Sequence, residues 1–319
     1  MSVFERKFHH RNWTDLPVIG ALFDQWALPG RPSANSGLRV AVRKNYLNFY
    51  RRGQSVAKLH STNRLLRLSV HEEYAANTTK QTRGDTKLTG YAQFDEDWLS
   101  EERNASSVLG WIETAETYAG AEKSYVDELV AANPGTIDIE MGLPAYDGEV
   151  NAPRMDLVLI EDNPTFPCLA FWEAKCADNS EARAHGVPKV VDQVRKYERW
   201  MDKPGRKKDV VAAYREAAKI LLKLADDSNK PTGAAQDIWR RFTKAASPTI
   251  LGTPGVVIGG YCPVGYSKGY TENIEQRAKS LLERGHKDRL TKEFGLKVVY
   301  HATPEQTSDA LPSLAGPSL

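Results

Sequence analysis

Apolar positions follow two different patterns along the chain of 319 residues, and the change of pattern divides the chain. Residues 38–74 mix β-branched, aromatic and basic side chains around Gly53, which predicts the strands of a small antiparallel sheet. Residues 77–95 are polar and rich in Gly and Thr, as is typical of a loop or linker. We therefore expect a β-rich N-terminal module over residues 1–100, with no role assigned by the sequence.

Helical and strand patterns alternate in the rest of the chain. Helices are predicted over residues 106–131, 187–201, 210–227, 235–246 and 271–284. Strands are predicted over residues 136–143, 154–161, 168–175, 255–262 and 296–302. This order predicts an α/β domain over residues 101–302. The Pro-, Ser- and Ala-rich residues 303–319 are expected to form a disordered tail.

Charged residues interrupt two of the apolar strands. Asp156 lies in RMDLVLIED, and Glu173 and Lys175 lie in LAFWEAKCA, with a short Pro-containing turn between the strands. We expect an antiparallel hairpin that brings the three side chains together. Because side chains alternate along a strand, Glu173 and Lys175 share one face and Ala174 points to the other.

A metal ion explains why carboxylates are placed in buried strands. An unpaired ion costs several kcal/mol to bury. Magnesium or manganese would be held by Asp156, Glu173 and the carbonyl of Ala174, with Glu140 as a further candidate, because these hard cations prefer oxygen ligands. Lys175 would then act as a point charge toward a phosphate or an attacking water. This constellation predicts metal-assisted hydrolysis.

The spacing of these residues resembles that of the PD-(D/E)xK phosphodiesterases, which include restriction endonucleases and RecB-like nucleases. Asp156 is followed 17 positions later by Glu173-Ala174-Lys175, and helical patterns lie on both sides. The proline of the family motif is displaced, because Pro153 lies three positions before Asp156. The resemblance implies a restriction-endonuclease-like mixed central sheet flanked by helices.

Two helical segments add to the resemblance. Glu122 in EKSYVDELV is similar to the acidic residue with which family members hold a metal-bound water. Gln193 and Tyr197 are four positions apart on the helix after Lys175 and are similar to the Q-x-x-x-Y element of the RecB-like branch. In that branch the pair braces the active site and approaches DNA. The resemblance therefore adds Glu122 and Gln193 to the catalytic residues and Tyr197 to the DNA contacts.

Composition limits the classes of partner. Lys and Arg total 43 against 41 Asp and Glu, so any nucleic-acid surface must be local. Arg195, Lys196 and Arg199, beside Gln193 on the same predicted helix, are the candidates for contacting DNA phosphates. The three cysteines form no CxxC pair, which argues against a zinc ribbon. No signal peptide or membrane-spanning run is evident, so the expected location is the cytoplasm.

These observations predict a magnesium-dependent deoxyribonuclease. The resemblance favours a restriction endonuclease or another antiviral defence protein of a bacterial or phage system, with DNA processing second. The alternatives are a catalytically silent DNA-binding or scaffolding subunit and an enzyme that acts on RNA. Cleavage of both strands would favour a homodimer. A partner protein from a defence system and an activating ligand are left open, as is the cut site.

Overall fold

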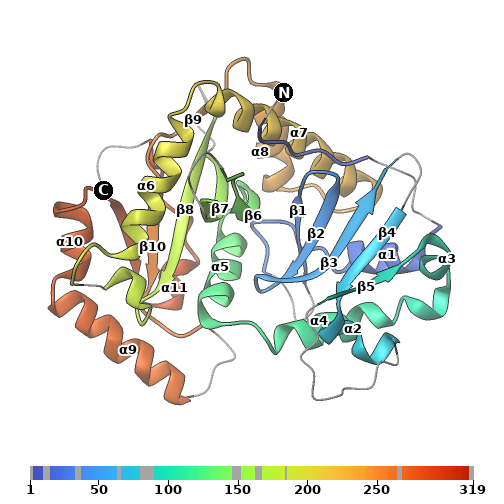
Figure 1. The fold of residues 1–319 in the computed structure, drawn as a ribbon, viewed down its shortest axis with the longest axis horizontal. Coiled ribbons are helices and arrows are strands. Elements are labelled where there is room, and N and C mark those ends of the chain that lie inside the picture. The colour runs from blue at the N-terminus through green and yellow to red at the C-terminus, as the bar shows by residue number, and fades with distance from the viewer. Residues whose placement is uncertain are drawn as a thin grey trace.

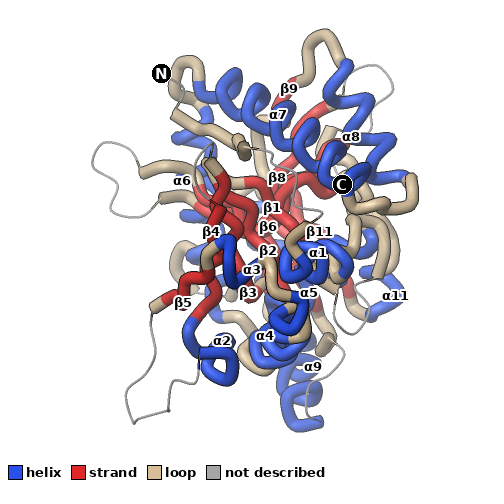
Figure 2. The backbone as a smooth tube through the Cα atoms, turned by 90° about the vertical axis from the view of Figure 1, so that its right-hand side faces the viewer, coloured by secondary structure: helices blue, strands red, loops and turns tan. Residues whose placement is uncertain are grey.

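The protein is a mixed α/β structure with an antiparallel sheet and a mixed sheet flanked by helices. In Figure 1 the antiparallel sheet lies to the right of the mixed sheet, and Figure 2 shows the strands in the middle of the molecule, with helices around them. The computed structural model describes residues 3–9, 15–32, 37–62, 66–79, 90–145, 152–161, 167–183, 185–263 and 268–315.

The first sheet is a meander in which each strand pairs antiparallel with the next. Its strands are β1 (Arg39–Val42), β2 (Tyr46–Arg51), β3 (Gln54–Ser61), β4 (Leu66–His71) and β5 (Tyr91–Phe94). The predicted antiparallel sheet is confirmed. The linker predicted over residues 77–95 is wrong at its end, because β5 pairs with β4 through Leu68 and Phe94, both buried.

The second sheet carries the residues predicted to be catalytic. Its strands are β6 (Thr136–Gly142), β7 (Arg154–Glu161), β8 (Cys168–Cys176), β9 (Thr249–Ile250), β10 (Gly255–Gly259) and β11 (Lys297–His301). The order is β11-β10-β8-β7-β6, and β9 pairs with the start of β8. Strands β6, β7 and β8 are antiparallel, whereas β8, β10 and β11 are parallel. The predicted strands of this region are confirmed.

Helices cover both sheets, and most follow the predicted amphipathic patterns. The α-helices are α1 (Pro17–Asp24), α2 (Glu72–Thr79), α3 (Glu96–Leu99), α4 (Ser107–Glu116), α5 (Ala121–Ala132), α6 (Lys189–Met201), α7 (Arg206–Asp227), α8 (Ala234–Lys244), α9 (Lys268–Glu283), α10 (His286–Lys292) and α11 (Pro304–Thr307). The 3-10 helices are η1 (Glu102–Asn104) and η2 (Ser180–Ala182). The single helix predicted over residues 106–131 is wrong. It divides into α4 and α5, because Gly120 adopts an extended backbone at the start of α5.

A continuous hydrophobic core links the two sheets. One cluster of buried side chains contains Leu59 of β3, Trp111 of α4, Val158 of β7 and Phe242 of α8. Helix α4 packs against β2 and β3 of the first sheet. Residues on both sides of position 100 therefore share one hydrophobic core.

The predicted disordered tail is wrong for residues 303–315. Helix α11 lies within this stretch, and Leu311 and Leu314 are buried. The Leu314 amide donates to the Glu161 carboxylate at 2.7 Å, and the Leu311 amide donates to Asn133 Oδ1 at 2.8 Å. Leu311, Leu314 and the buried Thr307, whose hydroxyl lies 2.6 Å from that of Tyr261, therefore hold the segment against the domain.

A substitution of Gly135 tests the close approach between the start of β6 and β7. A Cβ atom on Gly135 would lie 2.3 Å from the carbonyl oxygen of Ile160, which is backbone and cannot rotate away. We expect Gly135→Ala to lower the free energy of unfolding by about 1–3 kcal/mol, as measured by urea denaturation. Gly110→Ala on α4 is the control. A Cβ there meets nothing within 4 Å, so a helix propensity gain of about 0.5–1 kcal/mol is expected. If the two substitutions changed the free energy of unfolding equally, the close approach of Gly135 to the Ile160 carbonyl would not be what makes position 135 sensitive.

Candidate active site

The β7–β8 hairpin places Asp156 and Glu173 opposite one another. Leu157 pairs with Trp172, a register that continues to Asp156 and Glu173. The Ala174 amide donates to Asp156 Oδ2 at 2.8 Å. Ala174 itself packs into the core cluster on the other face of the sheet, beside α5. The predicted hairpin and the shared face of Glu173 and Lys175 are therefore confirmed.

Lys175 is buried at the centre of several carboxylates. Its ammonium group lies 2.6 Å from Glu173 Oε1, 3.5 Å from Glu122 Oε1 and 3.7 Å from Glu181 Oε2. The Lys175 and Glu173 residues are 3% and 2% exposed, so this ion pair is almost completely desolvated. The carboxylates therefore hold the lysine in one position and keep it charged.

Glu122 reaches the hairpin from the first turn of α5. Its Oε2 atom accepts a hydrogen bond from Asn179 Nδ2 at 2.7 Å and another from the Cys176 amide at 3.4 Å. The structure thus brings Glu122 to the site, as the sequence predicted. Asn179 and Glu181 were not predicted. The feature of the sequence that could have indicated them is the run of polar residues directly after the strand that carries Lys175, because residues at the end of a strand lie close to the side chains near that end.

Electrostatic interactions perturb the protonation of all three hairpin residues. Burial raises the pKa of Asp156 well above its usual range, and the nearby Glu173 and Glu140 charges raise it further. Burial likewise raises the pKa of Glu173 to about 7. Burial alone would lower the pKa of Lys175, but Glu173 and Asp156 raise it above its usual value. In the folded protein Asp156 and Glu173 therefore bind a proton more readily than free carboxyl groups do, because burial and the neighbouring carboxylates disfavour their charged forms.

The hairpin fits a divalent cation. Glu173 Oε2 is buried without a hydrogen-bond partner in the described part of the chain, although a buried carboxylate oxygen is costly to leave unpaired. Among the described residues, no three His, Cys, Asp or Glu side chains form a complete metal-binding group. Two carboxylates are sufficient for magnesium, which usually keeps several waters. Asp156 and Glu173, with the Ala174 carbonyl, are the residues that would hold it.

Glu140 lies on β6 beside the hairpin. Ile139 pairs with Leu157 and Met141 with Met155, which puts Glu140 opposite Asp156. Its backbone has φ of 51°, in the left-handed region that non-glycine residues seldom adopt. Such strain is concentrated at functional sites. The position of Glu140 supports it as a further carboxylate of the site.

Gln193 and Tyr197 lie on α6, but Tyr197 cannot contact DNA directly. Tyr197 is 0% exposed, and its ring centroid lies 4.8 Å from that of Phe171 on β8. The predicted nucleic-acid contact is therefore wrong, because the tyrosine belongs to the core beneath the helix. Gln193 Oε1 is also buried, and within the described residues Gln193 forms no hydrogen bond to the carboxylates. A catalytic role for Gln193 stays a prediction.

Removing the Tyr197 hydroxyl tests whether Tyr197 is a core residue that makes no contact with nucleic acid. The hydroxyl is buried and has no hydrogen-bond partner among the described residues. We expect Tyr197→Phe to leave the free energy of unfolding unchanged or raise it by up to about 1 kcal/mol, because the variant no longer buries an unpaired polar group. Affinity for a labelled oligonucleotide should equal that of the wild type. Weaker binding with unchanged stability would show that the hydroxyl contacts nucleic acid.

The basic residues of α6 are placed differently from Tyr197. Arg195 and Arg199 are exposed, and Lys196 is half-buried. The guanidinium of Arg195 lies 5.7 Å from the ring centroid of Phe294. The exposed positions are compatible with the predicted phosphate contacts, which stay a prediction.

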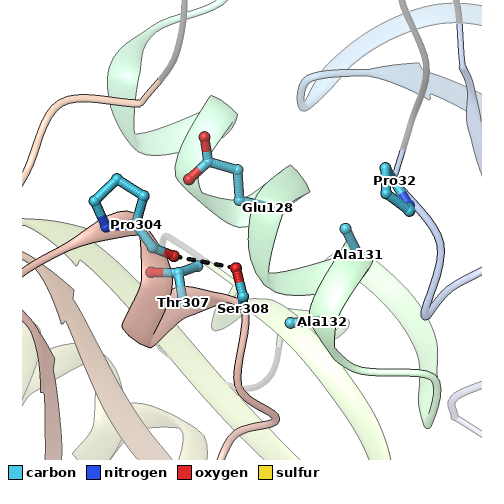
Figure 3. A pocket seen from close by; sticks show the side chains of 7 residues that line it. All are labelled: Pro32, Glu128, Ala131, Ala132, Pro304, Thr307 and Ser308. Atoms are coloured by element: carbon cyan, nitrogen blue, oxygen red, sulfur yellow. Dashed lines mark hydrogen bonds between the residues drawn. The ribbon is translucent and has the colours of Figure 1, made fainter.

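Two cavities differ in their relation to this site. One of about 350 Å³ is lined by Ser180, Glu181, Arg183, Val187 and Lys189 and adjoins Lys175 through Glu181. The other, of about 340 Å³, lies between α5 and α11, where the Ser308 hydroxyl donates to the Pro304 carbonyl at 3.3 Å (Figure 3). None of its lining residues belongs to the carboxylate cluster. Of these two cavities, the one beside Glu181 therefore borders the carboxylate cluster.

Comparisons with protein-family models, with curated proteins and with solved structures find no match. Within the described ranges, no helix has the length and apolar character needed to cross a membrane.

Proposed function

We propose that the protein is a magnesium-dependent nuclease that hydrolyses phosphodiester bonds of DNA. The observation that carries the proposal is the Asp156–Glu173–Lys175 face, on which a buried carboxylate oxygen of Glu173 has no partner among the described residues. The order α5-β6-β7-β8, followed by η2 and α6 and, after α7, α8 and β9, by β10, supports a restriction-endonuclease-like arrangement, because these residues lie on a central hairpin that follows α5 and precedes α6. The resemblance of the sequence motif points to the same class.

Each residue of the site has a distinct part in this proposal. Asp156 and Glu173 would hold the cation, which when bound activates water and neutralises charge on the phosphate. The Ala174 amide fixes the orientation of Asp156 through its 2.8 Å hydrogen bond. Lys175 supplies a fixed positive charge, and Glu122 and Glu181 hold its ammonium in place. Preorganised charge of this kind stabilises a transition state without reorganisation cost.

The substrate and biological setting follow from the family resemblance rather than from a particular residue. DNA is proposed as the substrate and antiviral defence or restriction as the setting. A homodimer or a partner protein of a defence system would supply the second active site needed to cut both strands. RNA is the alternative polymer, because the same metal chemistry serves both.

Incubation with DNA tests the proposal. Linear and supercoiled DNA, and a matching RNA, are incubated with the purified protein in magnesium, manganese or chelator. Metal-dependent cleavage of DNA is expected, and the chelator should abolish it. Absence of cleavage across all metals and DNA forms, with DNA still retained in a binding assay, would reject the nuclease.

That outcome would favour a catalytically silent DNA-binding or scaffolding subunit. One observation favours this second function: the Lys175 ammonium already occupies Glu173 Oε1 at 2.6 Å, so one of the two oxygens is neutralised by the protein itself. Retention of DNA with the same affinity in chelator and in magnesium would support it.

A further inference from the structure

A cluster of arginines lies next to the proposed active site. Arg183 follows η2, directly after the β8 strand that carries Glu173 and Lys175. Arg277 lies on α9, and Arg284 follows that helix. Both are exposed, and both lie near enough to Arg183 for their charges to act on it. Arg277 and Arg284 therefore add positive charge to the surroundings of Arg183.

The guanidinium of Arg183 is only partly satisfied by the protein. Its Nη2 atom donates to the Asp178 carbonyl oxygen at 2.6 Å. Its Nε atom is buried and has no hydrogen-bond partner in the part of the chain that the structure describes. A planar guanidinium normally donates from several N–H groups at once. The arginine is thus fixed in position by one bond and keeps further donor capacity.

Charge repulsion within the cluster is not balanced by ion pairs. Among the described residues, no acidic side chain forms an ion pair with Arg183, Arg277 or Arg284. Burial lowers the pKa of Arg183, and the charges of Arg277 and Arg284 lower it further, whereas Asp178 acts against them. Gathering like charges is unfavourable, so an anion would relieve the repulsion.

Arg183 opens into the cavity beside Glu181. Arg183 lines the cavity of about 350 Å³ together with Lys189, Glu181, Ser180 and Val187. Glu181 brings a negative charge to this wall, but that charge is shared by two cations. Its Oε2 atom lies 3.7 Å from Lys175, and its other carboxylate oxygen pairs with Lys189. The same cavity is therefore lined by Arg183 and by Glu181, whose carboxylate contacts Lys175 of the proposed site.

We propose that Arg183 binds a backbone phosphate of the nucleic-acid substrate next to the phosphodiester that is cut, and that Arg277 and Arg284 add positive charge around this subsite. Arginine suits this ligand, because its N–H groups match two phosphate oxygens at once. The subsite would fix the position of the strand across the β7–β8 hairpin. This inference rests on the proposed function, because the proposed nuclease supplies the polymer to which the phosphate belongs.

Oligonucleotide binding in chelator tests the subsite separately from cleavage. Fluorescence anisotropy is measured with labelled single-stranded and duplex DNA for the wild type, Arg183→Ala, Arg183→Lys and the double variant Arg277→Ala/Arg284→Ala. Arg240→Ala is the matched control, since Arg240 is an arginine on α8 that pairs with Asp237 at 3.1 Å and does not line the cavity.

We expect Arg183→Ala and the double variant to bind about tenfold more weakly. The slope of log affinity against log salt should fall by about one for each phosphate that a variant no longer binds. Arg183→Lys keeps the charge but not the two-pronged geometry, so partial recovery is expected. The control should bind as the wild type does. The double variant changes exposed positions, which keeps the test valid if Arg183→Ala fails to fold.

Wild-type affinity in both folded variants would overturn the subsite, as would absence of binding by the wild type itself. Cleavage with unchanged binding in the variants would leave the nuclease standing and reject only the subsite. Weakened binding in the variants without any cleavage by the wild type would retain the phosphate site and reject the nuclease.

Discussion

Glu173→Gln is expected to reduce metal-dependent DNA cleavage by about a thousandfold or more. The amide keeps the shape of the side chain but removes the charge that would hold the cation, and a bound cation contributes several kcal/mol to stabilising the transition state. The measurement is the initial cleavage rate of linear DNA at saturating magnesium. The metal-free fold should survive, because Glu122 and Glu181 still neutralise Lys175 and because the variant no longer buries a carboxylate whose pKa burial raises to about 7.

Two comparisons distinguish a catalytic effect from a structural one. Glu161→Gln changes a carboxylate at the other end of the same hairpin, where it accepts from the Leu314 amide at 2.7 Å, and should cleave like the wild type. Lys175→Ala should also abolish cleavage, but it leaves Glu173, Glu122 and Glu181 without their shared cation and should unfold at lower urea. Wild-type cleavage by Glu173→Gln would remove the hairpin from the active site.

Asp138→Asn is expected to lower the free energy of unfolding by about 3–5 kcal/mol, because it leaves two buried guanidinium groups without their counter-ion. Asp138 lies on β6, and its side chain is 1% exposed. It pairs with Arg6 at 3.0 Å and Arg43 at 2.5 Å, and it accepts from the Tyr214 hydroxyl at 3.0 Å. One carboxylate thus joins the N-terminal segment, the first sheet and α7 to the second sheet.

The pH dependence of unfolding gives a second measure of the same network. Burial would raise the pKa of Asp138, but Arg43 and Arg6 outweigh it and hold the pKa below the ordinary value of 3.8. The folded state therefore binds the proton less readily than the unfolded state. The carboxylate stabilises the fold above pH 3.8, and this contribution disappears as the pH falls through the lower, folded-state pKa.

Urea denaturation at several pH values checks both expectations. The difference between the wild type and Asp138→Asn should be largest near neutral pH and shrink below pH 3.8. Asp226→Asn is the control, since this side chain is 68% exposed and lies 4.0 Å from Arg240, and a surface pair contributes at most about 1 kcal/mol. A loss of stability in Asp138→Asn no larger than in the control would show that the buried network is not what joins the sheets.

The sequence by itself determined the helices and strands in which apolar residues recur with a clear period. Strands β6, β7, β8 and β10 and helices α6, α7 and α8 all lie where the apolar spacing predicted them, because a buried face imposes a period of two or 3.6 residues. Alternation along β8 also determined that Glu173 and Lys175 share a face, whereas Ala174 faces the opposite core. The central residues of the proposed site could be predicted from the sequence because they are charged residues within strands that are otherwise apolar.

Only the tertiary structure decided which distant segments meet. It places Asn179 and Glu181 around the hairpin, buries Tyr197 against Phe171 and packs Thr307, Leu311 and Leu314 into the core. None of these follows from a local period, because each depends on which element packs over which face. A short tyrosine-bearing motif has the same sequence whether its ring faces solvent or core, and burial by a neighbouring strand decides between them.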